Sequence, residues 1–453
     1  MILMKRAIEL AALSTILIFT IVLPPAAEAG ATWTVNAKMT LEGIQAVIDQ
    51  AGDGDTVVFE KGAYDFSGAP FRQTTEYVGA LNIVDKSLVL EAQRGVIIKG
   101  ARSVLNGDGY GESGIVAFHF KNVARDKDVA VKGFSFKTML EGIGVYGCRN
   151  VVVQNCIVDD MDRNGVGFEG VGGDLTVENN QIGSWRVGIF ADWYYFDPTF
   201  SGQWDLYSQT LGTQLRIADN VITRMGEFPG SMGIYLNRFR AGQITGNAVA
   251  SKGGEEGIYI ASMKPPDVTQ TLPRCVVSGN TVQGGFYGID VTSASGVQVD
   301  NNTVSGTNWG IDLVYASDCS VFGNTISDVV ARGIFLYGDN CTRNQVTGNL
   351  IKVAGYPGWA TSGNSYGITT SAHHNVYSRN TVTGTGSVAF YIYAGHDEVF
   401  ECNNAKNFKP APTAAHYVFF TYASNNRFSE TWANGVCYLD FGTNNTVTTV
   451  ACR

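Results

Sequence analysis

The sequence predicts an all-β chain folded as a single-stranded parallel β-helix, with three short strands in each coil. Two recurring signatures carry this prediction. A Gly-Ile pair begins at Gly188, Gly233, Gly257, Gly288, Gly310, Gly333 and Gly367. An Asn stands two residues before an Ile or Val at Asn180, Asn220, Asn247, Asn280, Asn302, Asn324, Asn349 and Asn380. The middle of this series, Asn280, Asn302 and Asn324, is evenly spaced, and we take that spacing as the length of one coil.

Each repeat contains three apolar-alternating pieces that are rich in Ile and Val, which is the pattern of short strands. No repeat has an apolar stripe long enough for a helix, and the Leu-x-x-Leu-x-Leu frame of leucine-rich repeats is missing. We expect each repeated Asn to supply left-handed backbone geometry at the bend between the second and third strands. Stacked Asn side chains can also form amide ladders along the axis.

These repeats resemble the right-handed parallel β-helix repeat of the pectate-lyase-like superfamily, from about Leu81 to Val447. The resemblance implies a right-handed solenoid of roughly a dozen coils. NosD-type accessory proteins share such repeats. The stretch YYFDPTF from Tyr194 to Phe200 is similar to the Tyr-Gly-Phe-Asp-Pro-His-Glu of mannuronan epimerases, with Thr199 at the position of that family's His. The signature motifs of pectate lyases and polygalacturonases are missing, so no subfamily is assigned.

The chain divides into three predicted parts: a signal peptide over 1–29, an N-terminal cap over 30–80 and the β-helix over 81–453. Lys5 and Arg6 precede an apolar run that is short for a bilayer span, and Ala27-Glu28-Ala29 is typical of a cleavage site. No later stretch is long and apolar enough to span. We therefore expect a secreted or periplasmic protein with no membrane span after cleavage.

The predicted cap contains a helix over Thr40 to Gln50. Leu41, Ile44, Val47 and Ile48 fall on one helical face, and Thr40 suits the N-terminal capping position. The following AGDGDTVVFEKGAY is typical of a turn, a strand and a second turn. A helix here would close the open end of the solenoid, where core and strand edges would otherwise be exposed.

Composition narrows the class of partner. The formal net charge is −9 and only 16% of residues are charged, which argues against nucleic acid. The 20 Tyr and 24 Phe exceed what a solenoid core needs, and sugar rings stack on exposed aromatic rings. We expect a polysaccharide or cell-surface glycan as the partner. The 8 Cys form no C-x-x-C pair and no Cys/His zinc pattern, and neither their pairing nor the oligomeric state is predicted.

Asp290 and Asp312 are the candidate catalytic residues. Each follows a Gly-Ile pair, so both should point outward from the same place in consecutive coils, about 4.8 Å apart. Two carboxylates at that spacing suit an acid–base or nucleophile pair of a retaining glycosidase, a Ca²⁺ site, or a pair of solvated side chains.

Outward positions one and three residues after the inward-pointing Ile or Val of other coils give the candidate substrate-binding residues: Glu169, Asp192, Tyr235, Asn237, Tyr259 and Tyr337. Arg186 is a candidate clamp for an acidic group, or a solvated charge at the rim. The aromatic loop over 192–213 is a candidate sugar platform, or a loop that packs on its own aromatic cluster or caps the outer sheet. His373 and His374 stand at a coil corner, where they could serve as a base or as metal ligands, or be solvated.

The predicted function is that of an exported carbohydrate-binding or polysaccharide-processing protein, of the lyase, hydrolase or epimerase type. The alternative is a non-catalytic β-helix scaffold, which includes a NosD-type accessory protein. The sequence names no cofactor, although Ca²⁺ fits the Asp pair.

Overall fold

We describe the protein from a computed structural model, which covers residues 30–69, 72–73, 79–105, 111–122, 124, 126–192, 214–223, 226, 230–239, 241–261, 275–355, 365–405, 407–410, 418–421, 423–432, 438–440 and 442–448. The predicted signal peptide, the YYFDPTF stretch and most of the aromatic loop lie outside these residues. Within the described part, no helix is long and apolar enough to cross a membrane.

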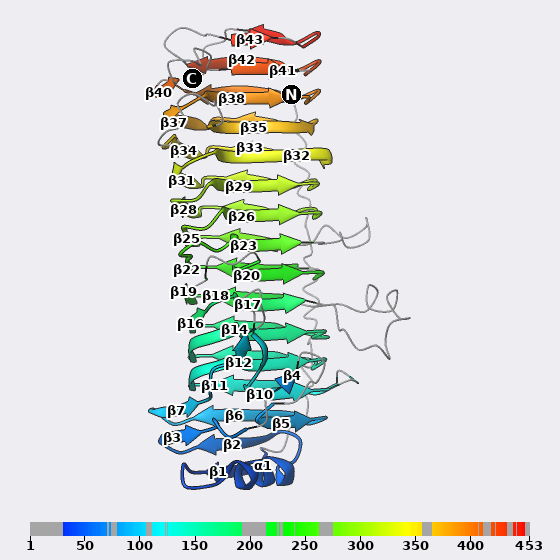
Figure 1. Cartoon of the computed structure of the whole chain (residues 1–453). Coiled ribbons are helices and arrows are strands. Elements are labelled where there is room, and N and C mark those ends of the chain that lie inside the picture. Colours follow the sequence, from blue (N-terminus) through cyan, green and yellow to red (C-terminus); the bar gives the residue numbers. More distant parts are fainter. Residues whose placement is uncertain are drawn as a thin grey trace, which may run out of the picture.

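The described chain is a right-handed parallel β-helix, as the sequence predicts. A single sheet system of 41 strands winds along the axis, so that each strand pairs with its counterparts in the coils before and after it (Figure 1). A small antiparallel sheet of β4 (Arg72–Gln73), β8 (Val104–Leu105) and β9 (Gly111–Gly114) accompanies the first coils.

The coil strands form three faces. Face A carries the Gly-Ile strands: β5 (Leu81–Val84), β10 (Val116–Lys121), β12 (Ser135–Tyr146), β14 (Ile157–Glu169), β17 (Val187–Asp192), β20 (Met232–Asn237), β23 (Glu256–Ala261), β26 (Tyr287–Thr292), β29 (Trp309–Val314), β32 (Arg332–Thr342), β35 (Tyr366–His373), β38 (Val388–Tyr393), β41 (Val418–Thr421) and β43 (Tyr438–Asp440). The long strands β12 and β14 begin on face C and bend onto face A.

Face B contains β1 (Thr32–Val35), β2 (Asp55–Phe59), β6 (Leu88–Ala92), β11 (Val129–Lys132), β13 (Val151–Gln154), β15 (Leu175–Glu178), β18 (Gln214–Ala218), β21 (Ala241–Thr245), β24 (Cys275–Ser278), β27 (Gln298–Asp300), β30 (Ser320–Phe322), β33 (Gln345–Thr347), β36 (Val376–Ser378), β39 (Val399–Asn404), β42 (Arg427–Trp432) and β44 (Thr446–Thr448).

Face C contains β3 (Gly62–Asp65), β7 (Val96–Lys99), β16 (Gln181–Ser184), β19 (Val221–Thr223), β22 (Ala248–Ala250), β25 (Thr281–Gln283), β28 (Thr303–Ser305), β31 (Thr325–Val329), β34 (Leu350–Val353), β37 (Thr381–Gly386) and β40 (Phe408–Pro410).

The N-terminal end is closed by helix α1 (Leu41–Gln50), which lies beside β1 and below β2 in Figure 1. The predicted helix is confirmed: the Thr40 hydroxyl accepts a hydrogen bond from the Gly43 amide, and Ile44 and Ile48 are buried. Lys86 Nζ donates to three carbonyl oxygens at the helix C-terminus. Strands β2 and β3, which lie inside the predicted cap segment, already pair in register with β6 and β7.

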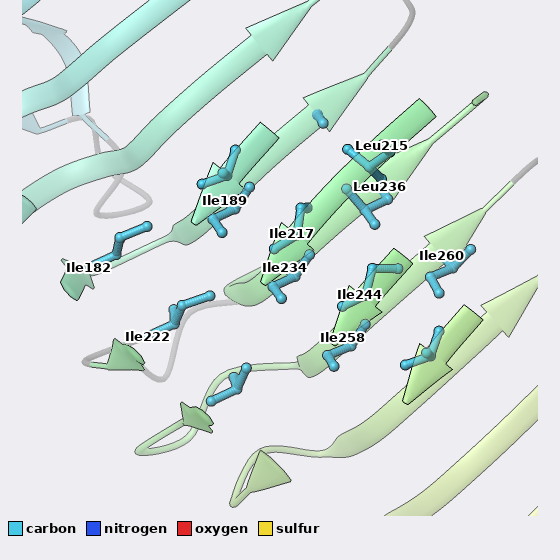
Figure 2. Close-up of a cluster of buried hydrophobic side chains, with 14 of the residues drawn as sticks. Ile182, Ile189, Leu215, Ile217, Ile222, Ile234, Leu236, Ile244, Ile258 and Ile260 are labelled. Atoms are coloured by element: carbon cyan, nitrogen blue, oxygen red, sulfur yellow. The ribbon is translucent and has the colours of Figure 1, made fainter. Parts of the chain in front are cut away.

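The core is a set of stacked apolar ladders. Ile189, Ile234 and Ile258 occupy the same register position in consecutive coils, and each is fully buried (Figure 2). Complete burial of each such side chain contributes about 2 kcal/mol. The Gly of the Gly-Ile pair is needed at the preceding bend, because a Cβ on Gly288 would overlap the Gly310 carbonyl and the Val304 side chain.

The predicted Asn ladder is confirmed. In the central coils, the amide oxygen of Asn302 accepts hydrogen bonds from the backbone N–H and the side-chain Nδ2 of Asn280, and Asn324 does the same for Asn302. The expectation that these Asn residues adopt left-handed geometry is wrong. The residue before each one has the positive φ, as at Gly279 (φ 64°) and Asn301 (φ 52°), which leaves the ladder Asn free to turn its side chain inward.

Five cysteines, Cys148, Cys156, Cys275, Cys319 and Cys341, are buried free thiols. Burial raises the pKa of Cys156 to about 12, so these thiols pack as small apolar side chains rather than react. Cys402 is disulfide-bonded.

Candidate functional site

Three outward-facing rows run along face A, one residue from each strand. The leading row holds the residue before each Gly-Ile pair and contains Glu256, Tyr287, Trp309 and Arg332 in consecutive coils. The acid row holds the residue after each pair and contains Phe190, Tyr235, Tyr259, Asp290, Asp312 and Phe335. The trailing row lies two residues further on and contains Glu169, Asp192, Asn237, Ala261, Thr292, Val314 and Tyr337.

Asp290 and Asp312 are register partners in adjacent coils, which confirms the predicted neighbourhood. They differ in their surroundings. Asp290 is 7% exposed, and its Oδ1 accepts a hydrogen bond of 2.8 Å from the Thr292 hydroxyl. Asp312 is 1% exposed, and neither of its oxygens accepts a hydrogen bond within the described residues. Asp290 therefore lies nearest to solvent, and Asp312 lies beneath the surface of the row.

Glu256 is a third buried carboxyl group beside them, and the sequence reasoning missed it. It is 6% exposed, and its Oε2 has no hydrogen-bond partner in the described structure. Its place in the sequence carries a signal, because Glu256 stands directly before Gly257 as Arg332 stands before Gly333. Residues in that position share the leading row, so Glu256, Tyr287 and Trp309 could have been placed beside the acid row.

The three carboxyl groups resist ionisation. Burial raises the pKa of Asp290 to about 6, although the Thr292 hydrogen bond opposes the change. Burial and the nearby Asp290 raise the pKa of Glu256 to about 8. Burial, again with Asp290, raises the pKa of Asp312 well above its ordinary value. At neutral pH the cluster therefore retains protons, with Asp290 the group that gives one up most readily.

Arg332 is the cation of this cluster. Its guanidinium carbon lies 4.4 Å from the ring centroid of Trp309 and 3.9 Å from that of Phe335, which is cation–π geometry. Burial lowers its pKa, and the nearby Asp312 opposes that change. From its place directly before Gly333, Arg332 is a candidate clamp for an acidic group of a substrate. The structure places it in the leading row between aromatic rings.

The aromatic residues of the acid row stack on one another. The rings of Phe190 and Tyr235 lie 5.0 Å apart at 3°, and those of Tyr235 and Tyr259 lie 5.4 Å apart at 19°. A ring whose faces are covered by its neighbours presents only its edge and its hydroxyl group outward. This applies to Tyr235, which lies between Phe190 and Tyr259. Tyr259 has a stacked ring on one side, and Asp290 occupies its register position in the next coil. The sugar-binding role of both tyrosines stays a prediction.

Tyr337 lies in the trailing row rather than the acid row, which corrects its predicted position. It is 44% exposed and packs edge-to-face against Tyr315, with 5.7 Å between the ring centroids. Phe286, on the leading-row side, is 41% exposed and packs near Trp309. Exposed rings thus flank the carboxyl cluster on both sides of face A.

The remaining predicted binding residues lie toward the N-terminal coils. Glu169, Asp192 and Asn237 share the trailing row, and Asn237 Nδ2 donates to Asp192 Oδ2 (3.1 Å) and to the Tyr235 hydroxyl (3.2 Å). Arg186 directly precedes β17 and is half-buried. These residues lie at least one coil before Glu256, so they do not join the carboxyl cluster.

A Ca²⁺ ion at the acid row would need more oxygen ligands close together than the carboxyl groups of Glu256, Asp290 and Asp312 provide. Among the described residues, the group of three or more His, Cys, Asp or Glu whose ligand atoms all lie within 4.8 Å is His374, His396 and Asp397. Glu256, Asp290 and Asp312 do not form such a group. Their carboxyl groups fit proton exchange better than the six to eight oxygens that Ca²⁺ takes.

Comparisons with known proteins agree with the fold. Residues 201–365, less than half of the chain, match the family described as "Periplasmic copper-binding protein (NosD)". No curated protein matches the sequence.

Several solved structures resemble the chain at low sequence identity. The family 28 exopolygalacturonase of Yersinia enterocolitica has 12% identity and a TM-score of 0.40, over 91% of this chain and 78% of that one. The Streptococcus pneumoniae surface protein and adhesin PfbA has 11% identity and a TM-score of 0.42, over 92% and 100%. The mannuronan C-5 epimerase A-module of Azotobacter vinelandii has 14% identity and a TM-score of 0.35, over 92% and 100%.

These structural likenesses carry no argument about activity at such scores. The pairing of strands between coils and the family match describe the fold, not an activity. In fold, the chain is a right-handed parallel β-helix, with no subfamily assigned.

Proposed function

We propose that the protein is an exported polysaccharide-processing protein whose reaction centre is the carboxyl cluster of face A. The observation that carries the proposal is the cluster itself: Glu256, Asp290 and Asp312 are buried on the outward side of the sheet, and each has a raised pKa. Perturbed carboxyl groups gathered at one place are typical of acid–base sites.

The roles follow from the order of the pKa values. Glu256, with a pKa of about 8, is protonated at neutral pH and can donate a proton to a glycosidic oxygen. Asp290, with a pKa of about 6, is largely ionised there and can act as base or nucleophile. Asp312 lies deeper and acts as a positioning residue, because it can hold a proton while Asp290 is charged.

The flanking aromatic residues provide the binding surface. Tyr337 and Tyr315 lie on the trailing side and Phe286 on the leading side, and all three are well exposed. Their separation across face A suits a glycan chain that crosses the acid row, with sugar rings against aromatic rings at either end. A mainly neutral or partly cationic glycan fits this surface better than a polyanion, since the net charge is −9.

Release of reducing or unsaturated ends from a panel of glycans tests the proposal. Asp290→Asn and Glu256→Gln should abolish turnover while glycan binding survives, and Asp312→Asn should lower turnover and shift its pH profile. Asp300→Asn is the matched control, because Asp300 is equally buried (5% exposed) but lies on face B. Activity that persists in both Asp290→Asn and Glu256→Gln would refute the acid–base role.

A non-catalytic scaffold is the second candidate. The stacked rings of Phe190, Tyr235 and Tyr259 and the buried position of Asp312 favour it, because they leave little reactive surface open. The match of residues 201–365 to a periplasmic family is compatible with it. Glycan binding with no released ends in any buffer between pH 4 and 8 would support this alternative.

A further inference from the structure

We propose that the corner formed by His374, His396 and Asp397 is a binding site for a divalent transition-metal ion of the zinc type. This site is independent of the proposed function and of the carboxyl cluster. Its residues belong to the coils of β35 and β38, two and three coils beyond Asp312, and lie outside the segment 201–365.

The coil geometry aligns these residues as two pairs in adjacent coils. His373 pairs with His396 across adjacent coils, and the amide of His374 donates to the His396 carbonyl. His374 (φ 59°) and Asp397 (φ 57°) share the left-handed conformation one residue further along each coil. Both pairs have the same separation in the sequence, which is one coil.

The three potential ligand atoms all lie within 4.8 Å of one another. His396 Nδ1 lies 2.9 Å from Asp397 Oδ2, and His374 Nδ1 lies 3.6 Å from the same oxygen. Ligands bound tetrahedrally to zinc at about 2.0–2.1 Å lie about 3.3 Å apart. The two measured distances fall on either side of that value, so small side-chain rotations would seat an ion.

His373 supports the site without serving as a ligand. Its ring stacks on that of His396, with 3.7 Å between centroids at 15°. Its Nδ1 accepts a hydrogen bond from the His396 amide (3.4 Å), and its Nε2 lies 3.6 Å from Asp339. With both ring nitrogens directed at other groups, His373 fixes the orientation of the His396 ring.

The ligand chemistry selects the class of metal. Two imidazoles and one carboxylate suit Zn²⁺, Cu²⁺ or Ni²⁺, whereas Ca²⁺ and Mg²⁺ need more oxygen ligands. Three protein ligands leave a fourth tetrahedral position to water. The ligand side chains are 40–56% exposed, so an ion can reach them from solvent.

A neighbouring pair shows what the same corner looks like without a third ligand. Two coils earlier in the same left-handed column, Arg343 and Asp318 form a two-pronged ion pair with distances of 2.7 and 2.6 Å. There a cation side chain neutralises the carboxylate. At Asp397 the neighbouring coil supplies imidazoles instead, which bind a metal ion through lone pairs.

Calorimetric titration of the tag-free secreted chain with Zn²⁺ alone tests the proposal. One ion should bind per chain, and His374→Ala, His396→Ala and Asp397→Asn should each weaken binding at least tenfold. Asp339→Asn is the matched control, because it removes the carboxylate beside His373 and not a ligand, and the variant should bind Zn²⁺ as the parent does.

Cobalt provides a second readout that does not depend on affinity alone. Co²⁺ bound to the parent chain should give the intense visible bands of four-coordinate cobalt, and the Asp397→Asn variant should lose them while its circular dichroism stays unchanged. Equal Zn²⁺ binding by the parent and all three ligand variants, or no Zn²⁺ binding by a folded parent, would overturn the proposal.

Discussion

The Asn ladder and the acid row are both stacks of buried polar side chains in register along the same solenoid, yet their hydrogen bonding differs. Asn302 is 1% exposed, accepts two hydrogen bonds from Asn280 and donates to the Val277 carbonyl and to Asn324. Asp312 is equally buried, and its two oxygens accept no hydrogen bond within the described residues. The Asn ladder has partners for its polar atoms, whereas the acid row contains Asp312, which has none among the described residues.

The difference separates structure from function. A buried polar group that has all its hydrogen-bond partners stabilises the fold. A buried polar group without partners lowers the free energy of unfolding. An unsatisfied polar group in an otherwise regular repeat is typical of a functional site. The ladder therefore holds the coils together, and the acid row is where we propose that the chemistry occurs.

Removal of a ladder residue should have the largest effect on stability. Asn302→Ala leaves two donors of Asn280 and the Val277 carbonyl without partners, so we expect the free energy of unfolding to fall by about 3 kcal/mol. Chemical denaturation at pH 7 measures the change. A variant as stable as the parent would mean that the ladder is not a structural element.

Removal of a carboxylate charge from the acid row should raise the free energy of unfolding. The pKa of Asp290 is raised from 3.8 to about 6 in the folded state, so its contribution to stability is complete below pH 4 and is lost as the pH rises through 6. Asp290→Asn should therefore gain about 2 kcal/mol at pH 8 and nothing at pH 4. Melting curves at the two pH values test this, and a destabilised variant at pH 8 would contradict it.

The smallest effect is expected at a buried carboxylate that has partners. Asp300 accepts hydrogen bonds from the Ser278 hydroxyl (2.9 Å), Gln298 Nε2 (3.0 Å) and Asn301 Nδ2 (2.7 Å). Asp300→Asn should lose about 1 kcal/mol at both pH 6 and pH 8. Because Asp290 and Asp300 are the same residue type at similar burial, opposite signs at pH 8 would isolate the effect of hydrogen bonding.

The repeat made the architecture readable from the sequence. The Gly-Ile pair lies near the start of the face A strands from β17 to β35. The even period of the repeat places Asp290 opposite Asp312, as the structure confirms. The helix over Thr40 to Gln50 was predicted from its capping residue and apolar face, and α1 is observed there. In a solenoid the strand register follows from the repeat, so residues at the same position of consecutive repeats lie side by side in adjacent coils.

Burial on the outward face could not be predicted in the same way. The alternation of strands predicts that Asp312 points away from the core. It does not predict that Trp309, on the same strand, packs with Arg332 and Phe335 of the next coil beside it. The stacking of Tyr235 on Tyr259 likewise depends on ring rotation rather than on sequence position.

The corner of His374, His396 and Asp397 could have been predicted from the sequence, because its residue pairs are separated by one coil length. Only His373 and His374 were named there from the sequence.

The pH dependence of stability tests the central claim most directly. We compare the parent with the triple variant Glu256→Gln, Asp290→Asn, Asp312→Asn by denaturant unfolding at steps between pH 5 and pH 8. Because all three carboxyl groups have raised pKa values in the folded state, the parent should lose stability as the pH rises across this range. The triple variant should lose much less and be the more stable protein at pH 8. Parallel curves for the two proteins would show that the acid row ionises as freely as solvated carboxylates do, and would contradict the account.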